Sequence, residues 1–333
     1  MRPDKVSPRH HMTKRIYTSI IRIFIAVAVI VIAIWIYIAQ PTTAGNQRSL
    51  LHVDAARLRT HVETLSARNF PRDYRETDNL NKCADYILKN LAQAGAVTEL
   101  QEFTAQGNKY FNVIGRFNRD KAQKIVIGAH YDTVQGTPGA DDNASGVAGL
   151  IELAYLIGKH ELNIGVELVA YSLEEPPFFG TEMMGSVAHA ASIRGMDNIK
   201  GVIVLEMIGY YDDQRWSQSY PMALQKILYP NRGNFIAVVG RTDQRAFTKQ
   251  VKIGMRGATD MPVYSLNAPG FIPGVDFSDH RNYWPHGLNA VMITDTAFYR
   301  NKAYHRANDA PDRLDYDRMA KVVVGVFAAI KRL

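Results

Sequence analysis

The chain begins with one long apolar stretch and then alternates between two hydrophobic patterns. After residues 23–39, short apolar runs of strand length alternate with stretches whose apolar residues recur at helical spacing. This alternation is typical of a mostly parallel sheet covered on both faces by helices. We therefore predict an α/β fold, a three-layer α/β/α domain with a mostly parallel mixed central sheet. The expected strands are 97–103, 111–117, 125–127, 165–172, 200–207, 235–239 and 290–294, and the expected helices are about 49–67, a segment around Cys83 that ends at Gly95, 147–154, 242–253 and 315–331.

The apolar stretch at residues 23–39 contains no charge, glycine or proline. Together with residues 19–21 it approaches the roughly 20 residues that span a bilayer. Arg22 can extend its long side chain to the head groups at one end, and Trp35 and Tyr37 suit the interface at the other end. We predict one N-terminal transmembrane helix.

The flanking charges orient this helix. Residues 1–15 hold five basic residues and one acidic residue, so the positive-inside rule keeps the N-terminus cytoplasmic and exports the rest. A cleaved signal peptide is the alternative, since small residues at 42–44 resemble a cleavage site, but the apolar run exceeds the usual signal core. The predicted location is the cell (inner) membrane, single-pass, with a periplasmic or extracellular domain. The predicted division is a cytoplasmic basic tail at 1–18, a transmembrane signal anchor at 19–39, a linker at 40–48 and one exported domain at 49–333.

The basic character of the chain belongs largely to this N-terminus. The whole chain carries a formal net charge of +7, but residues 1–22 hold six of its 39 Lys and Arg and one of its 32 Asp and Glu, which leaves +2 for the remainder. The exported part therefore gives no charge argument for nucleic-acid binding. Cys83 is the single cysteine, which excludes an intrachain disulfide, and its apolar neighbours indicate a core residue.

Residues with metal-binding chemistry follow the expected strand at 125–127. His130 and Asp132 are two positions apart, so on an extended chain they point to the same side. A loop then delivers Asp142 and Asn143 to the start of the next helix, and ligand sites of open α/β sheets lie at such strand ends. His and Asp suit a divalent metal. The alternative is structural, with Asp142 or Asn143 as a helix N-cap and His130 as an ordinary buried histidine.

Further acidic and imidazole side chains follow other expected strands. Several carboxylates that converge in a cleft repel one another, and bound cations would remove that cost. Glu174 and Glu175 precede two prolines and two phenylalanines, so they are not expected to point freely into water. The full set consists of Glu174 and Glu175 after 165–172, Glu206 at the end of 200–207, Asp279 and His280 in SDH, and His305 after 290–294.

These motifs, taken in order, resemble the co-catalytic di-zinc exopeptidase family that includes secreted bacterial leucine aminopeptidases, with glutamate carboxypeptidases and glutaminyl cyclases as related branches. The resemblance spans about residues 78–333. It rests on GAHYDTV, PGADDNASG, EEPPFFGT, LEMIGY, SDH and the late His305.

The resemblance implies two zinc ions per chain and a role for each matching residue. His130 and Glu206 match terminal ligands of one ion, and Asp142 matches a bridging carboxylate. Many family members have Asp at the position of Glu206, a departure that affects the metal spacing more than the reaction class. The ligands of the other ion are expected to be Glu175 and His305.

The remaining implied roles concern catalysis. Asp132 matches the residue that orients His130, and Glu174 matches the general acid/base. Asp279 and His280 receive no ligand role. Since one carboxylate cannot both bind a metal and carry a proton, two adjacent glutamates with different tasks fit a metal-activated water.

The function that these expectations favour is a membrane-anchored zinc aminopeptidase, which hydrolyses N-terminal residues from peptides with a free N-terminus. Loops from 208–285 are expected to face the substrate. A carboxypeptidase would need an arginine-lined pocket, for which Arg241, Arg245, Arg256 and Arg281 are available. A glutaminyl-cyclase-like enzyme, hydrolysis of a non-peptide amide and a non-catalytic receptor-like binding module are further alternatives, and the oligomeric state stays open.

Overall fold

A mixed eight-stranded sheet forms the centre of the computed structural model, which describes residues 8–333 and the side chains of residues 15–333. The strand order is β1-β2-β4-β3-β5-β8-β6-β7. Of the neighbouring pairs in these residues, β3–β4, β3–β5, β5–β8 and β6–β7 are parallel, whereas β1–β2, β2–β4 and β6–β8 are antiparallel. The strands are β1 Val97–Ala105, β2 Asn108–Phe117, β3 Lys124–His130, β4 Gly165–Tyr171, β5 Ile199–Glu206, β6 Ile236–Arg241, β7 Val263–Ala268 and β8 Ala290–Thr294.

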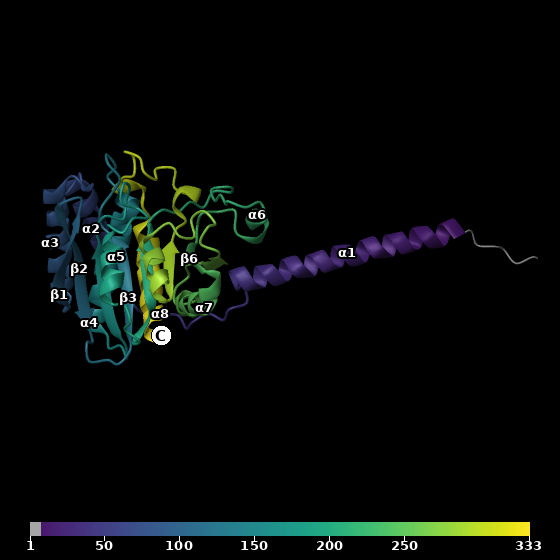
Figure 1. Cartoon of the computed structure of the whole chain (residues 1–333), viewed down its shortest axis with the longest axis horizontal. Coiled ribbons are helices and arrows are strands. Elements are labelled where there is room, and N and C mark those ends of the chain that lie inside the picture. Colours follow the sequence, from purple (N-terminus) through teal and green to yellow (C-terminus); the bar gives the residue numbers. More distant parts are fainter. Residues whose placement is uncertain (1–7) are drawn as a thin grey trace, which may run out of the picture.

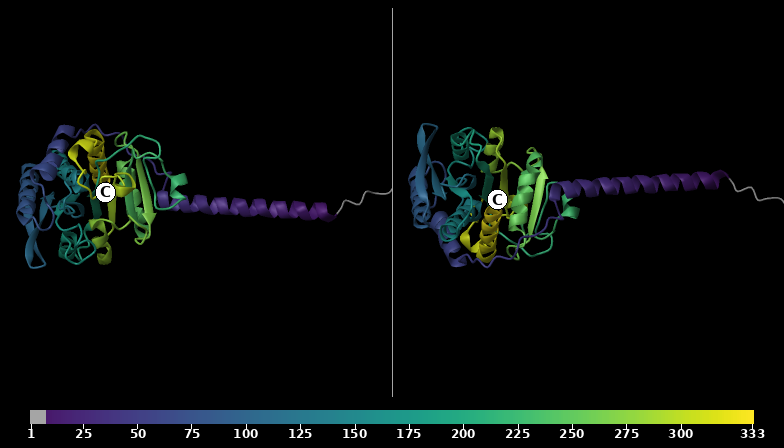
Figure 2. Two further views of the ribbon diagram at one scale, coloured as in Figure 1. Left: turned by 90° about the horizontal axis from the view of Figure 1, so that it is seen from above. Right: turned by 90° about the horizontal axis from the view of Figure 1, so that it is seen from below.

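Helices cover both faces of the sheet, as Figures 1 and 2 show. One face packs against α2, α3, α4, α7 and α8, and the other packs against α5 and the 3₁₀ segment Asp279–His286. This arrangement confirms the predicted three-layer α/β fold. The helices are α1 Pro8–Ala39, α2 Ala55–Glu63, α3 Thr77–Gln93, α4 Gly146–Lys159, α5 Gly185–Ser192, α6 Gln225–Leu228, α7 Arg245–Met255 and α8 Tyr316–Arg332.

The central strand β3 shows why short apolar runs become buried strands in this chain. Ile125 and Ile127 pack into the core on one face of the sheet, and Val126 packs into the core on the other face. Side chains alternate between faces along a strand, so a strand covered by helices on both sides needs apolar residues at consecutive positions. The end of β3 therefore lies deep in the domain, which places His130 in a buried position.

The sequence prediction missed the short helices α5 and α6 and the strand β7. The short helix α5 has only eight residues. In β7, Ser265 and Asn267 interrupt the apolar pattern, and the structure gives a reason for both: Ser265 Oγ donates to Ala39 O at 2.9 Å and Asn267 Nδ2 donates to Ile38 O at 2.9 Å. Since the last carbonyls of a helix lack partners within the helix, these polar side chains of β7 complete the hydrogen bonding of α1.

The predicted transmembrane segment lies in α1, which projects away from the domain at the β7 edge of the sheet, opposite β1 (Figure 2). Among the described residues, one helix is long and apolar enough to cross a membrane, and it covers Arg15–Ala39. Residues 1–7 of the predicted basic tail lie outside the described residues. The segment 40–48, expected to be a linker, lies against α7, where Gln40 and Thr43 are buried.

Lys252 holds the junction between α1 and the domain, because its buried ammonium donates from α7 to Ala39 O at 2.8 Å and to Gln40 O at 3.0 Å. We expect Lys252→Met to lower the free energy of unfolding by about 2 kcal/mol, since buried carbonyls would lose their donor. Denaturant unfolding of the full chain in detergent measures the change. Lys249→Met is the matched control, because Lys249 is exposed on the same helix. Equal stability of the two variants would contradict the prediction.

Candidate metal centre and active site

The sheet topology brings the predicted site residues together at the carboxyl ends of the central strands. The neighbouring strands β4, β3 and β5 are parallel, so their carboxyl ends meet. His130 ends β3, Glu206 ends β5, and Glu174 and Glu175 follow β4. His305 reaches the same place from the loop after β8. The site therefore lies at the strand ends where open α/β sheets place their ligands.

Asp142 lies between two groups of potential metal ligands. Its Oδ1 is 3.3 Å from His130 Nε2, which is also 3.4 Å from Glu206 Oε2. Its Oδ2 is 3.1 Å from His305 Nε2, which is also 3.2 Å from Glu175 Oε2. One carboxylate thus faces both groups, and the five residues are those that the sequence singled out as ligands.

Unsatisfied polar atoms test whether this cluster suits a metal. His130 Nε2, Asp142 Oδ2, Glu175 Oε1 and His305 Nε2 are shielded from solvent and have no hydrogen-bond partner of acceptable geometry. Buried polar atoms normally have partners, so this set of unpaired nitrogen and oxygen atoms suits a bound cation. Among the described side chains, the ligand atoms of each group lie within 4.8 Å of one another. Imidazole nitrogens and carboxylate oxygens are zinc ligands, so the residues fit zinc.

The electrostatics of the cluster also favour a cation. Burial raises the pKa of Glu174 well above its usual value, and the charges of Glu175 and Glu206 add to the rise, although His130 opposes it. Burial and the charge of Asp142 raise the pKa of Glu175 to about 8. Burial opposes protonation of His130, but the charges of Glu206 and Glu174 outweigh it and raise its pKa well above the usual value. The ionised carboxylates are therefore costly without positive charge beside them.

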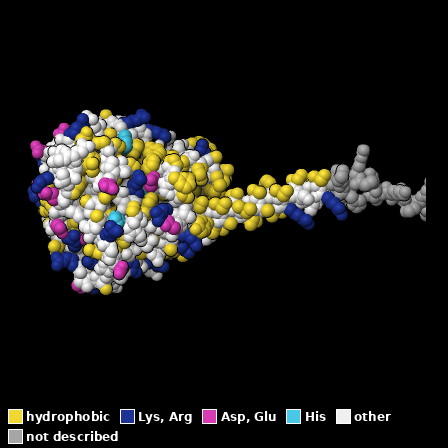
Figure 3. Space-filling view, in the orientation of Figure 1, with side chains coloured by type: hydrophobic (Ala, Val, Ile, Leu, Met, Phe, Trp, Pro, Cys, Tyr) yellow, Lys and Arg dark blue, Asp and Glu magenta, His cyan; other side chains and the backbone are white. Residues whose placement is uncertain are grey.

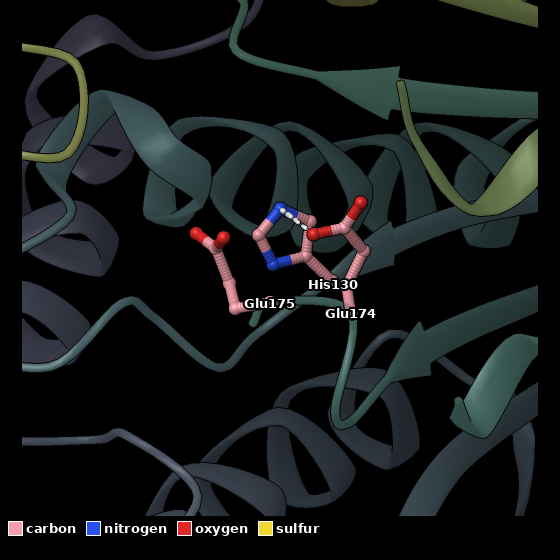
Figure 4. A group of neighbouring side chains, drawn as sticks. All are labelled: His130, Glu174 and Glu175. Carbon is pink, nitrogen blue, oxygen red and sulfur yellow. Dashed lines mark ion pairs between the residues drawn. The ribbon is translucent and has the colours of Figure 1, made fainter. Parts of the chain in front are cut away.

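The carboxylates of the adjacent residues Glu174 and Glu175 lie in different parts of the site. Figure 4 shows the carboxylates of Glu174 and Glu175 on opposite sides of the His130 ring. Glu174 Oε2 is 4.0 Å from His130 Nε2, whereas Glu175 reaches the group that contains His305. Asp132 fixes both, since its two carboxylate oxygens accept the backbone N–H groups of Glu174 and Glu175 at 3.1 Å each. Asp132 thus binds the backbone of both glutamates, and its Oδ1 also lies 3.5 Å from His130 Nδ1.

Residues that sequence reasoning missed support the ligands. Asp309 accepts the backbone N–H of Asp142 at 3.1 Å and that of Asp141 at 3.1 Å, which holds the loop that carries Asp142. Tyr304 stacks on His305 with ring centroids 3.7 Å apart. Neither residue had a distinctive motif of its own, because its role depends on contacts across the fold.

Asp279 and His280, which received no ligand role, are buried but belong to none of the ligand groups found among the described residues. His280 Nε2 is 2.8 Å from Val275 O, and burial lowers the pKa of His280 to about 4, so it is a neutral structural histidine. Burial raises the pKa of Asp279 to about 7.

Ser278 donates its hydroxyl to Glu206 Oε2 at 2.6 Å, so it orients one potential ligand from outside the metal centre. We expect Ser278→Ala to weaken zinc binding about tenfold, because residues that orient ligands typically contribute this much. Competition with a chromophoric chelator measures the affinity. Ser192→Ala is the control, since Ser192 Oγ donates only to the backbone of its own helix at His189 O. Unchanged affinity in Ser278→Ala would contradict the prediction.

An apolar pocket opens beside the metal centre at Glu206. Apolar side chains make up most of its walls, and most of the aromatic ones come from the region 208–285 that was expected to face the substrate. The wall residues include Tyr220, Tyr229, Phe235, Tyr264, Phe277 and Phe298.

Comparison with known proteins identifies a peptidase family and an aminopeptidase relative. The model of peptidase family M28 matches residues 112–330. The chain is 46% identical over 299 residues to the uncharacterized protein YfbL of Escherichia coli K12, covering 87% of this chain and 92% of that protein. It is 24% identical over 287 residues to leucine aminopeptidase 1 of Pyrenophora tritici-repentis, covering 81% and 68% of the two chains.

Solved structures share the fold. A zinc aminopeptidase from Bacillus subtilis matches with a TM-score of 0.68 at 14% identity, over 85% of this chain and 95% of that chain. A glutaminyl cyclase from Tannerella forsythia matches with a TM-score of 0.60 at 20% identity, over 85% of this chain and all of the other. At these identities the structural likeness concerns the fold alone. The match of the family model over most of the domain, together with the 46% identical relative, shows that the chain belongs to peptidase family M28.

Proposed function

We propose that this chain is a membrane-anchored zinc aminopeptidase that removes N-terminal residues from peptides. The observation that carries the proposal is the arrangement of two ligand groups around Asp142, with a further buried carboxylate, Glu174, beside them. The aminopeptidases among the relatives support the same reaction class. The apolar helix α1 supports the anchor, with the N-terminus in the cytoplasm and the domain outside the inner membrane.

The proposed metal centre holds two zinc ions. His130, Glu206 and Asp142 would hold one, and Asp142, Glu175 and His305 would hold the other, because these two groups share Asp142 and the ligand atoms of each lie within 4.8 Å of one another; His130 also forms such a group with Glu174 and Glu175. Zinc bound there supplies a Lewis acid that polarises the scissile carbonyl and acidifies water.

Glu174 is the proposed proton carrier. Its carboxylate lies in the site without belonging to the group that Asp142 shares with His305, and burial raises its pKa well above the usual value, which favours a carboxyl group that can hold a proton. It would take a proton from the attacking water and give it to the leaving amine. Asp132 would keep Glu174 in place through the backbone N–H that it accepts.

The pocket beside Glu206 favours an apolar N-terminal side chain, because apolar residues, many of them aromatic, form most of its wall. The carboxypeptidase alternative loses support here. Arg245 packs over Tyr37, Arg256 donates to Thr43 O and Arg241 pairs with Asp243. Arg281 pairs with Asp276. Among the described residues, none of these four arginines lines the pocket.

The test is mass spectrometry of peptides incubated with the full chain in detergent. Each peptide is supplied with a free and with an acetylated N-terminus, and with and without a metal chelator. Chelator-sensitive loss of single residues from free N-termini alone is the expected result. Shortening from the C-terminus would replace the proposal with a carboxypeptidase, and loss of ammonia from N-terminal glutamine would replace it with a cyclase. No reaction by zinc-loaded protein would favour a binding module or a non-peptide amidase.

A further inference from the structure

Hydrogen bonds tie the end of α1 to the domain. Ser265 and Lys252 donate to Ala39 O at 2.9 and 2.8 Å, and the segment that follows stays bound to the domain. Arg256 Nη1 donates to Thr43 O at 2.7 Å, and Asn46 N donates to Arg256 O at 2.5 Å. No free spacer therefore separates the described part of α1 from the domain surface, so the position of the helix fixes the position of the domain.

The length of α1 then determines how near the domain lies to a bilayer. From Arg22 to Ala39 an α-helix extends about 26 Å, whereas the hydrocarbon core is about 30 Å thick. Arg22 can reach outward to the head groups at its own end. The other end at Ala39 must consequently lie at the lipid boundary, together with the domain surface around it.

That surface is apolar on the side of α6. Ile227 is 81% exposed, and Met222 and Leu224 are exposed beside it. The end of this segment lies against α1, since Leu228 shares a groove with Trp35 of α1. Figure 3 shows hydrophobic side chains gathered where α1 leaves the domain.

A second apolar protrusion lies in the loop after β7. Phe271 is 82% exposed, two residues after Pro269. Pro269 shares a shallow groove with Ala33, Ile34 and Tyr37, which lie in the last two turns of α1. This loop thus extends along the part of α1 that a membrane would cover.

Charged and amphipathic side chains border these protrusions. The Arg245 guanidinium lies 4.5 Å from the centroid of the Tyr37 ring, and Lys226 is exposed next to Ile227. Tyrosine and basic residues concentrate at the level of the lipid head groups, whereas large aliphatic and aromatic side chains lie at the acyl boundary. The pattern is that of an interfacial surface.

We propose that Met222, Leu224, Ile227 and Phe271 form a lipid-facing rim, which enters the head-group and acyl boundary of the bilayer beside α1 and seats the domain on the membrane. The occupant is a phospholipid surface, because Leu228 and Pro269, the neighbours of the exposed rim residues, share grooves with the apolar surface of α1. The inference rests on the proposed membrane anchor α1, but it does not depend on the proposed reaction.

The test uses the full chain in phosphatidylethanolamine and phosphatidylglycerol nanodiscs, with an environment-sensitive fluorophore on single introduced cysteines. Ile227→Cys and Phe271→Cys report on the rim. Val97→Cys is the matched control, since Val97 is an exposed aliphatic residue on β1 at the opposite edge of the sheet. The wild-type chain gives the labelling background, because Cys83 is buried. Each label is then exposed to lipid-borne doxyl groups and, separately, to aqueous iodide.

The expected result is a blue-shifted emission at positions 227 and 271, with doxyl quenching several-fold stronger and iodide quenching several-fold weaker than at position 97. Iodide quenching equal to that at position 97 would place the rim in water and overturn the proposal. Protection of the rim labels from both quenchers would also overturn it, since another protein surface would then cover them. The substituted positions are exposed, so thermal unfolding of each variant should match the wild-type chain.

Discussion

Glu174→Gln should reduce peptide hydrolysis about a thousandfold or more while the zinc content stays at the wild-type level. Glutamine has nearly the same shape as glutamate, but it cannot accept a proton from water and return it to an amine. Asp132 would still hold the backbone at position 174, because the hydrogen bond is made by the N–H group. The measurement pairs turnover on a leucyl peptide with elemental analysis of the purified variant.

Glu175→Gln is the matched control for this assignment, since it makes the same chemical change one residue away. Glu175 lies 3.2 Å from His305 Nε2, so we expect this variant to lose zinc as well as activity. Zinc loss in Glu174→Gln with zinc retention in Glu175→Gln would exchange the roles of the two residues. Full activity in Glu174→Gln would remove Glu174 from the chemistry.

The predictable part of the fold follows from local patterns. The apolar run of β3 packs on both faces, so its hydrophobicity identifies it without knowledge of its neighbours. The site residues were predictable as candidates because they follow such runs, and the parallel neighbours β4, β3 and β5 then bring their ends together. Sequence position alone does not show that His130 and Glu206 lie close together, because their proximity depends on the strand order.

The parts that were missed depend on tertiary contacts. Ser265 and Asn267 make β7 look like a poor strand, and they are explained only by the carbonyls of α1 that they bind. The segment 40–48 is polar and suggests a spacer, yet Gln40 Nε2 donates to Arg245 O and Asn46 Nδ2 donates to Gly254 O. In both cases a polar residue has a distant backbone partner, which no periodicity reveals.

Asp142→Ala should eliminate hydrolysis and remove zinc from both ligand groups. Its two oxygens face different histidines, His130 at 3.3 Å and His305 at 3.1 Å, so one substitution takes a ligand from each group. His305→Ala and Glu206→Ala each change a single group. We therefore expect partial zinc loss in each of these two variants and nearly complete loss in Asp142→Ala.

The comparison of these three variants shows whether Asp142 is a ligand of both ions or of one ion only. Elemental analysis after dialysis at fixed free zinc gives the content of each, and circular dichroism checks that each is folded. If Asp142 bridges two ions, its substitution should cost more zinc than either single-group variant. If Asp142→Ala instead keeps as much zinc as His305→Ala, then Asp142 serves one group only, and Glu206 with His130 must bind its ion without it. Because each outcome changes the residues assigned to an ion, zinc content decides the architecture of the centre independently of the reaction that it catalyses.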